Sequence, residues 1–231
     1  MTTQTTTVDY RVIEENGFIH RVYGWMGGGL LTTAIVSFYV ATNQTILELI
    51  VGNSFIFFGL LLLEIGAVVY LSGFIHKMSA TQAGVIFFLY SVLNGVTMSF
   101  IFLVYVASSI ASVFVVSAGM FALVSAYGFL TKKDLTSWGN LLFMALIGLV
   151  LASVVNIFWV NDGFSLILAY AAVVIFVGLT AYDTQKIKEL NDTLSIGGED
   201  SKKASIIGAL RLYLDFINLF LALLRIFGRR R

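Results

Sequence analysis

Four ionisable residues occupy stretches of the sequence that are otherwise apolar. Glu64 lies in "LLLLEIGAVVYLS", Asp183 closes "GLTAYDTQ", and both Arg211 and Asp215 lie in "GALRLYLDFINLF". An acidic or arginine side chain at the centre of a membrane helix costs about 2.5–3.5 kcal/mol on a lenient insertion scale. Such residues normally face the interior of a helix bundle or a water-filled cavity. These four residues are therefore the candidates for chemistry.

Two kinds of chemistry are compatible with them. In the first, the charges are structural: Arg211 and Asp215 are four residues apart and can neutralise each other on one helix face, while a neutral Glu64 bonds to a neighbouring helix. In the second, several carboxylates converge on a hydrated cavity. Two close carboxylates cannot both ionise easily, so they share a proton and hold two helices together. Losing the proton makes the pair repel and gives a cation two hard oxygen ligands, which is a pH-sensitive gate.

The elements that position these residues are predicted to be membrane helices. Of the 231 residues, 58% are hydrophobic and only 12% are charged, with a mean hydropathy of +0.92, whereas soluble domains have about 25% charged residues. We therefore expect an all-α, polytopic membrane protein. Apolar runs near the ~20 residues that cross a membrane predict seven spans. They lie at about residues 22–41, 54–75, 83–106, 109–130, 140–160, 164–183 and 206–227.

The polar stretch from Thr184 to Ser205 decides whether two of the acids can meet. We expect it to continue helix six through "TQKIKEL" and then to turn at "SIGGEDSKK". Asp183 would then lie near the cytoplasmic end of helix six, with Asp215 about nine residues, or ~14 Å, into helix seven. They can meet only if helix six ends below the membrane surface or helix seven starts above it. The polar continuation favours the second arrangement.

Basic residues outside the spans predict the orientation in the membrane. The N-terminal segment and the second, fourth and sixth loops carry nine Lys and Arg residues, and the other loops carry none. This asymmetry places the N-terminus in the cytoplasm. Residues 1–21 would form a cytoplasmic segment, 22–227 the transmembrane domain and 228–231 a basic tail. The nine residues are Arg11, Arg21, Lys77, Lys132, Lys133, Lys186, Lys188, Lys202 and Lys203.

The tail "GRRR" conflicts with this orientation, because seven spans from a cytoplasmic N-terminus place it outside. Either the seventh segment crosses and the tail reaches the far headgroups, or the segment enters the membrane and turns back. We favour seven spans, because the first six helices carry the stronger charge asymmetry.

Other features narrow the function classes. The absence of cysteine excludes disulfides and thiolate metal sites, and two histidines, His20 and His76, are too few for a histidine-rich metal centre. The segment "GWMGGGLL" lacks the strand and the Lys-Ser/Thr ending of a phosphate loop, so it indicates close helix packing. Asn94 and Asn218 lie inside spans, where we expect interhelical hydrogen bonds.

The chain resembles the transmembrane Bax inhibitor motif family. The order and spacing of the matching segments agree from about residue 20 to the C-terminus, and the compact N-terminus and short loops resemble a bacterial member. The segments that carry the resemblance are "LLLLEIGAVVYLS", "HKMS", "SAYGFLTKKDLTSWG", "AYDTQKIKEL" and "GALRLYLDFINLFLALLRIFG". The resemblance implies a seven-helix fold whose seventh helix is enclosed by the other six.

The resemblance also implies a function: a calcium leak that is regulated by protonation of paired aspartates. Carried over by motif, these are Asp183 and Asp215, which would bind Ca²⁺ weakly as a permeant ion. Glu64 matches the family's acidic position in the second helix, and Arg211 and Asn218 would support the pair. Some relatives have an arginine at the cytoplasmic end of the second helix that latches the pair. Here that region reads "SGFIHKMS", so only His76 and Lys77 can serve.

Several alternatives stay open on the residues alone. An intramembrane aspartyl protease would share Tyr182–Asp183 but needs Gly-x-Gly-Asp and a later proline motif, which are absent. A retinal protein would need a lysine in the last helix, and a rhomboid-like protease an intramembrane histidine. We expect no enzyme and no cofactor. The closer rivals are a proton-coupled cation exchanger and a non-conducting regulator of stress, cell death or membrane proteases.

The expected partners and location follow from the same interpretation. We expect the protein to contact membrane lipid, calcium ions, protons and other membrane proteins, and not nucleic acid. As a bacterial member it would be a multi-pass protein of the plasma (inner) membrane.

Overall fold

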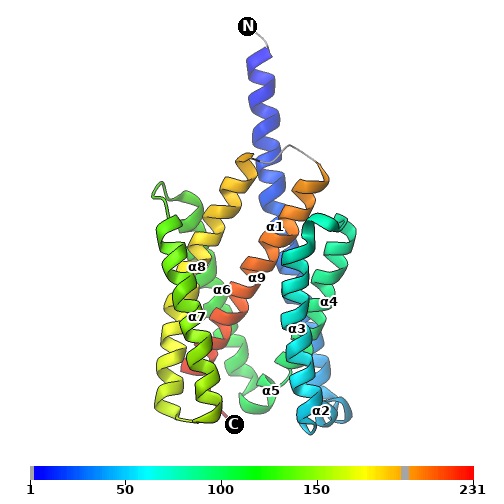
Figure 1. Ribbon diagram of the computed structural model, residues 1–231, viewed down its shortest axis with the longest axis vertical. Coiled ribbons are helices and arrows are strands. Elements are labelled where there is room, and N and C mark those ends of the chain that lie inside the picture. Colours follow the sequence, from blue (N-terminus) through cyan, green and yellow to red (C-terminus); the bar gives the residue numbers. More distant parts are fainter. Residues whose placement is uncertain (1–2, 194–197) are drawn as a thin grey trace. The chain divides into compact units, whose positions relative to one another are not determined.

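The computed structural model describes residues 3–193 and 198–231, and the regular elements within these ranges are helices. The all-α prediction is confirmed. In chain order the elements are α1 (Thr3–Thr42), α2 (Gln44–Val51), α3 (Ser54–Phe74), the 3-10 helix η1 (Ile75–Lys77), α4 (Ala80–Met98), α5 (Ile101–Val104), α6 (Ala107–Leu130), α7 (Thr136–Phe158), α8 (Asp162–Thr193) and α9 (Glu199–Phe227) (Figure 1).

Seven helical stretches of the described chain are long and apolar enough to cross a membrane. They match the seven predicted spans, most of them to within a few residues at each end. The stretches are Gly17–Thr42, Ser54–Lys77, Ala80–Val104, Ala107–Leu130, Thr136–Phe158, Asp162–Asn191 and Glu199–Phe227. The last is the most buried of the seven, with 72% of its most apolar window buried, as expected for the helix predicted to be enclosed.

The connection between the last two spans differs from the prediction. The polar stretch does continue the sixth span, because α8 runs to Thr193. Residues 195–197 of the predicted turn lie outside the described residues. The rest of that turn is wrong, because α9 already begins at Glu199. Its first turn is acidic, which suits the positive end of a helix dipole, and Lys203 pairs with Asp200 at 3.2 Å.

The chain divides into two compact units. Unit 1 comprises Met1–Leu103 and Glu189–Leu210, and unit 2 comprises Val104–Lys188 and Arg211–Arg231. Both α8 and α9 contribute residues to each unit.

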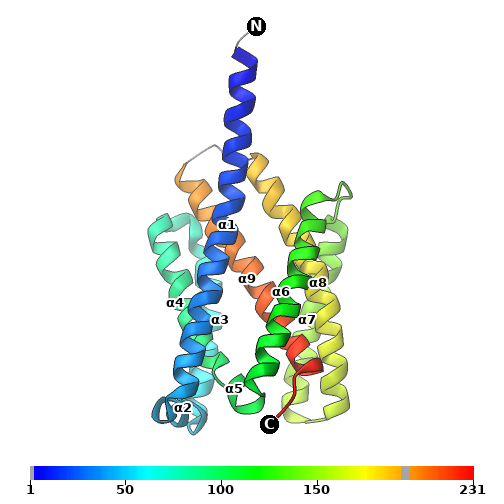
Figure 2. The ribbon, with the colours of Figure 1, turned by 180° about the vertical axis from the view of Figure 1, so that it is seen from behind.

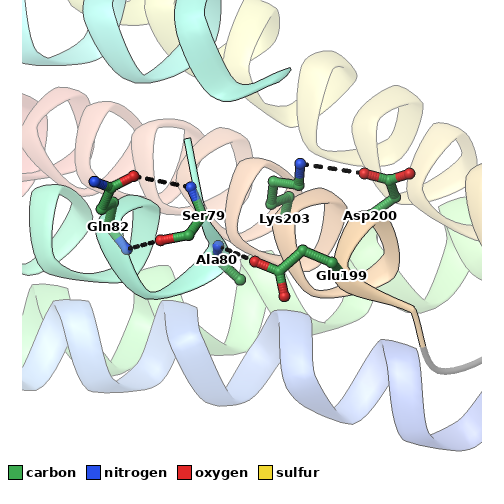
Figure 3. Close-up of polar contacts among 6 residues, drawn as sticks. All are labelled: Ser79, Ala80, Gln82, Glu199, Asp200 and Lys203. Carbon is green, nitrogen blue, oxygen red and sulfur yellow. Dashed lines mark hydrogen bonds and ion pairs between the residues drawn. The ribbon is translucent and has the colours of Figure 1, made fainter. Parts of the chain in front are cut away.

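Side-chain caps fix where α4 begins in unit 1 (Figure 3). Ser79 Oγ accepts from the backbone N–H of Gln82 at 3.2 Å, and the Gln82 side chain accepts from the Ser79 N–H at 2.9 Å. This reciprocal pair satisfies two donors that the first turn of a helix leaves free. The Ala80 N–H donates to Glu199 Oε1 at 2.6 Å, so the first turns of α4 and α9 are joined.

In unit 1, α1 packs closely against α4 at positions where one of the two helices has a glycine and therefore no side chain. A Cβ atom on Gly29 would lie 2.6 Å from the Phe87 ring, and one on Gly95 would lie 2.8 Å from the backbone oxygen of Thr33. The helix-packing interpretation of "GWMGGGLL" is therefore confirmed at Gly29, whereas Gly27 faces open space.

In unit 2, α6, α7 and α8 run side by side (Figures 1 and 2). A Cβ atom on Gly128 of α6 would collide with the backbone of Ala181 in α8, so these two helices touch at backbone distance. The Phe216 ring of α9 meets the rings of Phe114 and Phe121 of α6 edge-on, with centroids 5.4 and 5.6 Å apart. These contacts hold the part of α9 that carries Asp215.

The C-terminal residues of unit 2 are held by backbone hydrogen bonds. The Val106 N–H donates to Arg229 O and the Arg231 N–H donates to Val104 O, both at 3.0 Å, around an isolated bridge between Tyr105 and Arg230. The preceding helix, α9, is uninterrupted from Glu199 to Phe227. This continuity agrees with the crossing interpretation of the seventh segment, and a segment that turns back is not observed.

Candidate functional site

Asp183 and Asp215 come together in unit 2. Asp183 lies inside α8, and Asp215 lies well inside α9 because that helix starts at Glu199 rather than near residue 206. Of the two arrangements that would let the acids meet, the early start of helix seven is the one observed. The two carboxyl groups are within hydrogen-bonding distance of each other.

Arg211 lies beside this pair, but its ion-pair partner is not the predicted one. Its Nη1 atom is 3.6 Å from Oδ1 of Asp183, so the ion pair joins α9 to α8. The interpretation in which Arg211 pairs with Asp215 on its own helix is not the observed one. The Arg211 side chain is 54% exposed. Because exposed charges are screened, the guanidinium offsets only part of the charge on the two acids.

Asp215 is the more isolated of the two acids. Its residue is only 4% exposed, and its Oδ2 atom has no hydrogen-bond donor among the described residues. Burying an ionised carboxylate without donors costs several kcal/mol. Two ionised carboxylates can only accept hydrogen bonds, whereas one protonated carboxyl can donate to its neighbour. One proton held between Asp183 and Asp215 therefore satisfies both groups.

The pair lines a cavity of about 1180 Å³ within unit 2. The walls come from α7, α8 and α9 and are mainly apolar, with a few polar side chains. Besides the two acids, the polar lining includes Arg211, Asn218, Arg225 and Asn156. A cavity of this size with convergent polar groups is the usual form of a ligand or ion site.

Sequence reasoning missed part of this polar lining. Asn156 Nδ2 of α7 donates to Ser165 Oγ of α8 at 2.7 Å, and the other amide atom, Oδ1, is buried with no partner among the described residues. The signal was an asparagine in the apolar run "ASVVNIF". The same signal led to Asn94 and Asn218.

The two asparagines singled out from the sequence behave differently. Asn94 of α4 donates to Glu64 Oε2 of α3 at 3.4 Å, which confirms an interhelical bond. Asn218 donates to the Leu214 backbone oxygen of its own helix at 2.8 Å, so the interhelical prediction is wrong for the bond that this residue makes. Asn218 instead presents its side chain to the cavity of unit 2.

Glu64 and the predicted latch residues belong to unit 1. The Glu64 carboxylate accepts from Thr97 Oγ1 at 2.6 Å in addition to Asn94. This arrangement is the predicted bond to a neighbouring helix, and it places hydroxyl and amide donors, not a second acid, on Glu64. His76 and Lys77 form the end of η1, where the Lys77 ammonium lies 5.5 Å from the centroid of the Phe74 ring. Their role as a latch stays a prediction.

The site has few candidate metal ligands. Within the part of the chain that the structure describes, no three His, Cys, Asp or Glu side chains gather into a group that could hold a metal ion. Ca²⁺ usually takes six to eight oxygen ligands. Two carboxylates with nearby amide oxygens would therefore suit a weakly held, passing cation better than a resident one.

Fold and site together define a class of protein: a seven-span helical membrane protein in which two acids meet between its sixth and seventh spans, one of them buried and the other largely so. The family model described as inhibitor of apoptosis-promoting Bax1 matches residues 15–231, and the chain belongs to this family. The resemblance found from the sequence motifs is thereby confirmed.

Similar proteins come from several bacteria. The inner membrane protein YbhL of Escherichia coli is 51% identical over 215 residues, which cover 93% of this chain and 92% of the relative. An uncharacterized protein of Borreliella burgdorferi is 42% identical, with 95% of both chains covered. One of Deinococcus radiodurans is 41% identical, with 99% of this chain and 95% of the relative covered.

Proposed function

We propose that this protein is a pH-sensitive cation leak of the bacterial inner membrane, with Ca²⁺ as a permeant ion, gated by protonation of Asp183 and Asp215. One observation carries the proposal. Two carboxyl groups from different helices, one buried and one only 14% exposed, are within hydrogen-bonding distance on the wall of a cavity of about 1180 Å³. The inner-membrane location is supported by the name of the Escherichia coli relative.

In the closed state, one proton lies between the two carboxyl groups. It supplies the donor that Asp215 otherwise lacks and ties α8 to α9. Arg211 balances the one remaining negative charge from its place on Asp183. Three groups with one positive and one negative charge are then neutral as a set.

In the open state the proton has left. Two carboxylates then face a single, half-exposed guanidinium, and their repulsion separates α8 from α9. The freed oxygen atoms become ligands for a cation, with further oxygens available from Asn218 and Asn156 in the same cavity. Weak coordination by a few oxygens lets an ion enter and leave, which suits conduction. Flux therefore rises as the pH rises.

On this proposal the protein is a conductor and not an enzyme, and calcium passes through without serving as a cofactor. Protons act as the regulating ligand. The rivals are a proton-coupled exchanger, which would use the same acids to carry protons against a cation, and a regulator of partner membrane proteins, in which the acids would only hold the helices together.

Flux measurements on the purified protein in liposomes separate these functions. A leak passes calcium down its own gradient at a rate that increases with pH, with no need for an opposing proton gradient. Flux that requires a proton gradient would favour the exchanger. Protein-containing liposomes that pass no more calcium than empty ones at any pH would reject the proposal and favour the regulator.

A further inference from the structure

A groove of about 620 Å³ lies in unit 1, and none of its lining residues belongs to the carboxylate site. Its apolar walls come from α4, with Val85, Phe88, Leu89 and Val92, and from Trp25 of α1. The four α4 side chains are all exposed. Because α4 belongs to a membrane span, this surface faces a hydrocarbon environment rather than water.

The groove has a basic end. Arg21 of α1 and Lys202 of α9 line it together with Ala80 and Thr81 at the start of α4. The Arg21 guanidinium donates to the neutral Ser201 hydroxyl at 3.1 Å. Lys202 has no ion-pair partner among the described residues, whereas the adjacent Lys203 pairs with Asp200 (Figure 3). Both exposed cations line the groove, and among the described residues neither has a carboxylate partner.

The two ends of the groove match two depths of a membrane. Arg21, Lys202 and Ala80 each lie within the first turns of a span. Val92 lies twelve residues further along α4 than Ala80, about 18 Å at 1.5 Å per residue. The groove therefore runs from the level of the headgroups into the hydrocarbon core. Its basic end lies at the headgroups, and its apolar wall lies in the hydrocarbon core.

We propose that this groove binds an anionic phospholipid, with the phosphate between Arg21 and Lys202 and an acyl chain along Val85, Phe88 and Val92. Basic pockets between membrane helices recognise anionic headgroups in this way. The N-terminus of α4 is not the anion site, because Ser79 and Glu199 already accept from its first N–H groups. A zwitterionic lipid would fit the apolar wall equally well but would leave the two cations without a net opposing charge.

Trp25 provides a direct probe, since this residue lines the groove. Replacing Trp138 and Trp159, which are both highly exposed members of unit 2, by phenylalanine leaves Trp25 as the only tryptophan. This protein is reconstituted into vesicles that contain either phosphatidylglycerol or phosphatidylcholine with brominated acyl chains, and quenching of Trp25 is followed against lipid mole fraction. Each cation should contribute roughly a fivefold preference for the anionic lipid.

Lys202→Gln should then reduce this preference about fivefold, while Lys203→Gln, which removes the same charge one residue away, should leave it unchanged. Equal quenching by the two lipids, or equal effects of the two substitutions, would overturn the proposal. Loss of the preference on adding inorganic phosphate would assign the basic end to a soluble anion instead. A Trp25 that no lipid quenches would mean that a second copy or another protein covers the groove, and would also refute it.

Discussion

In unit 2, one guanidinium lies beside two carboxyl groups. Arg211 contacts Asp183 at 3.6 Å, and Asp215 is buried next to them with one oxygen unpaired among the described residues. The three side chains form one electrostatic set, so a change in any one of them alters the protonation of the others. The net charge of the three side chains, rather than any single contact, decides the pH at which the two acids hold a shared proton.

At this scale we predict the effect of Arg211→Gln. Without the guanidinium, the ionised form of the pair is less stable, so the protonated, closed form should persist to higher pH. The midpoint of calcium flux against pH should move upward by about 0.1 to 0.7 of a pH unit, because a half-exposed pair contributes about 0.2–1 kcal/mol. The control is Arg225→Gln, which removes a charge from the same cavity further along α9. An unchanged midpoint, or equal shifts for both variants, would contradict this role.

The sequence was sufficient to find the acids but not the partner of Arg211. Acids in apolar runs must face a protein interior, and this rule identified Asp183 and Asp215. The four-residue spacing also allowed an Arg211–Asp215 pair on one helix. At a spacing of four residues, a basic residue that precedes an acid makes a weaker ion pair than an acid that precedes a basic residue. The early start of α9 brings Asp183 within reach instead, and no local pattern encodes that alignment.

Among the helices, glycine sets the distance between α6 and α8. Gly128 lies against the backbone of Ala181, two residues before Asp183, so this contact fixes the wall behind the acid. A hydrogen bond between Ser125 Oγ and Thr184 Oγ1 at 2.9 Å joins the same two helices one turn away. The position of Asp183 therefore depends on how closely α6 approaches α8.

We accordingly predict that Gly128→Ala destabilises the protein in detergent by about 1–3 kcal/mol, because overpacking forces the two backbones apart. Gly119→Ala on the same helix is the matched control. Its Cβ would meet nothing within 4 Å, so it should be neutral or slightly stabilising. Thermal unfolding of both variants tests the difference. Equal stability of the two would show that the α6–α8 contact is not tight at Gly128.

Helix ends show where sequence patterns become insufficient. Apolar runs located every span, because their length is dictated by the thickness of the membrane. The beginning of α9 was missed, because its first residues are polar and hydropathy ignores them. An acidic first turn, the Asp200–Lys203 pair and the bond from Ala80 to Glu199 extend that helix. The acidic first turn and the Asp200–Lys203 pair are local charge patterns that could have indicated the early start of α9. The bond from Ala80 to Glu199 depends on the fold.

The topology of the whole molecule depends on its seven spans and on the charges of its loops. Seven spans put the two ends of the chain on opposite sides of the membrane, and the basic loops predict a cytoplasmic N-terminus. The natural chain contains no cysteine. Single cysteines at the exposed residues Lys132 and Arg231 can therefore be labelled with an impermeant thiol reagent in intact cells. Labelling should occur at residue 231 only, and labelling at residue 132 would contradict the predicted orientation.

In the proposed gate, Asp183 and Asp215 should act as one unit. Asp183→Asn or Asp215→Asn keeps a polar partner but removes the repulsion between like charges, so the pH dependence of flux should flatten. The double variant should resemble either single variant rather than the sum of both. Alanine at either position also removes the hydrogen bond, which should loosen closure and increase the leak at low pH.

Calcium flux into liposomes for wild type and both asparagine variants, between about pH 6 and 8, tests this claim most directly. The wild-type rate should rise with pH, whereas the rates of the two variants should change little across the range. Retention of the wild-type midpoint and slope by both variants would contradict the gate, and the charges would then serve only to hold α8 and α9 together.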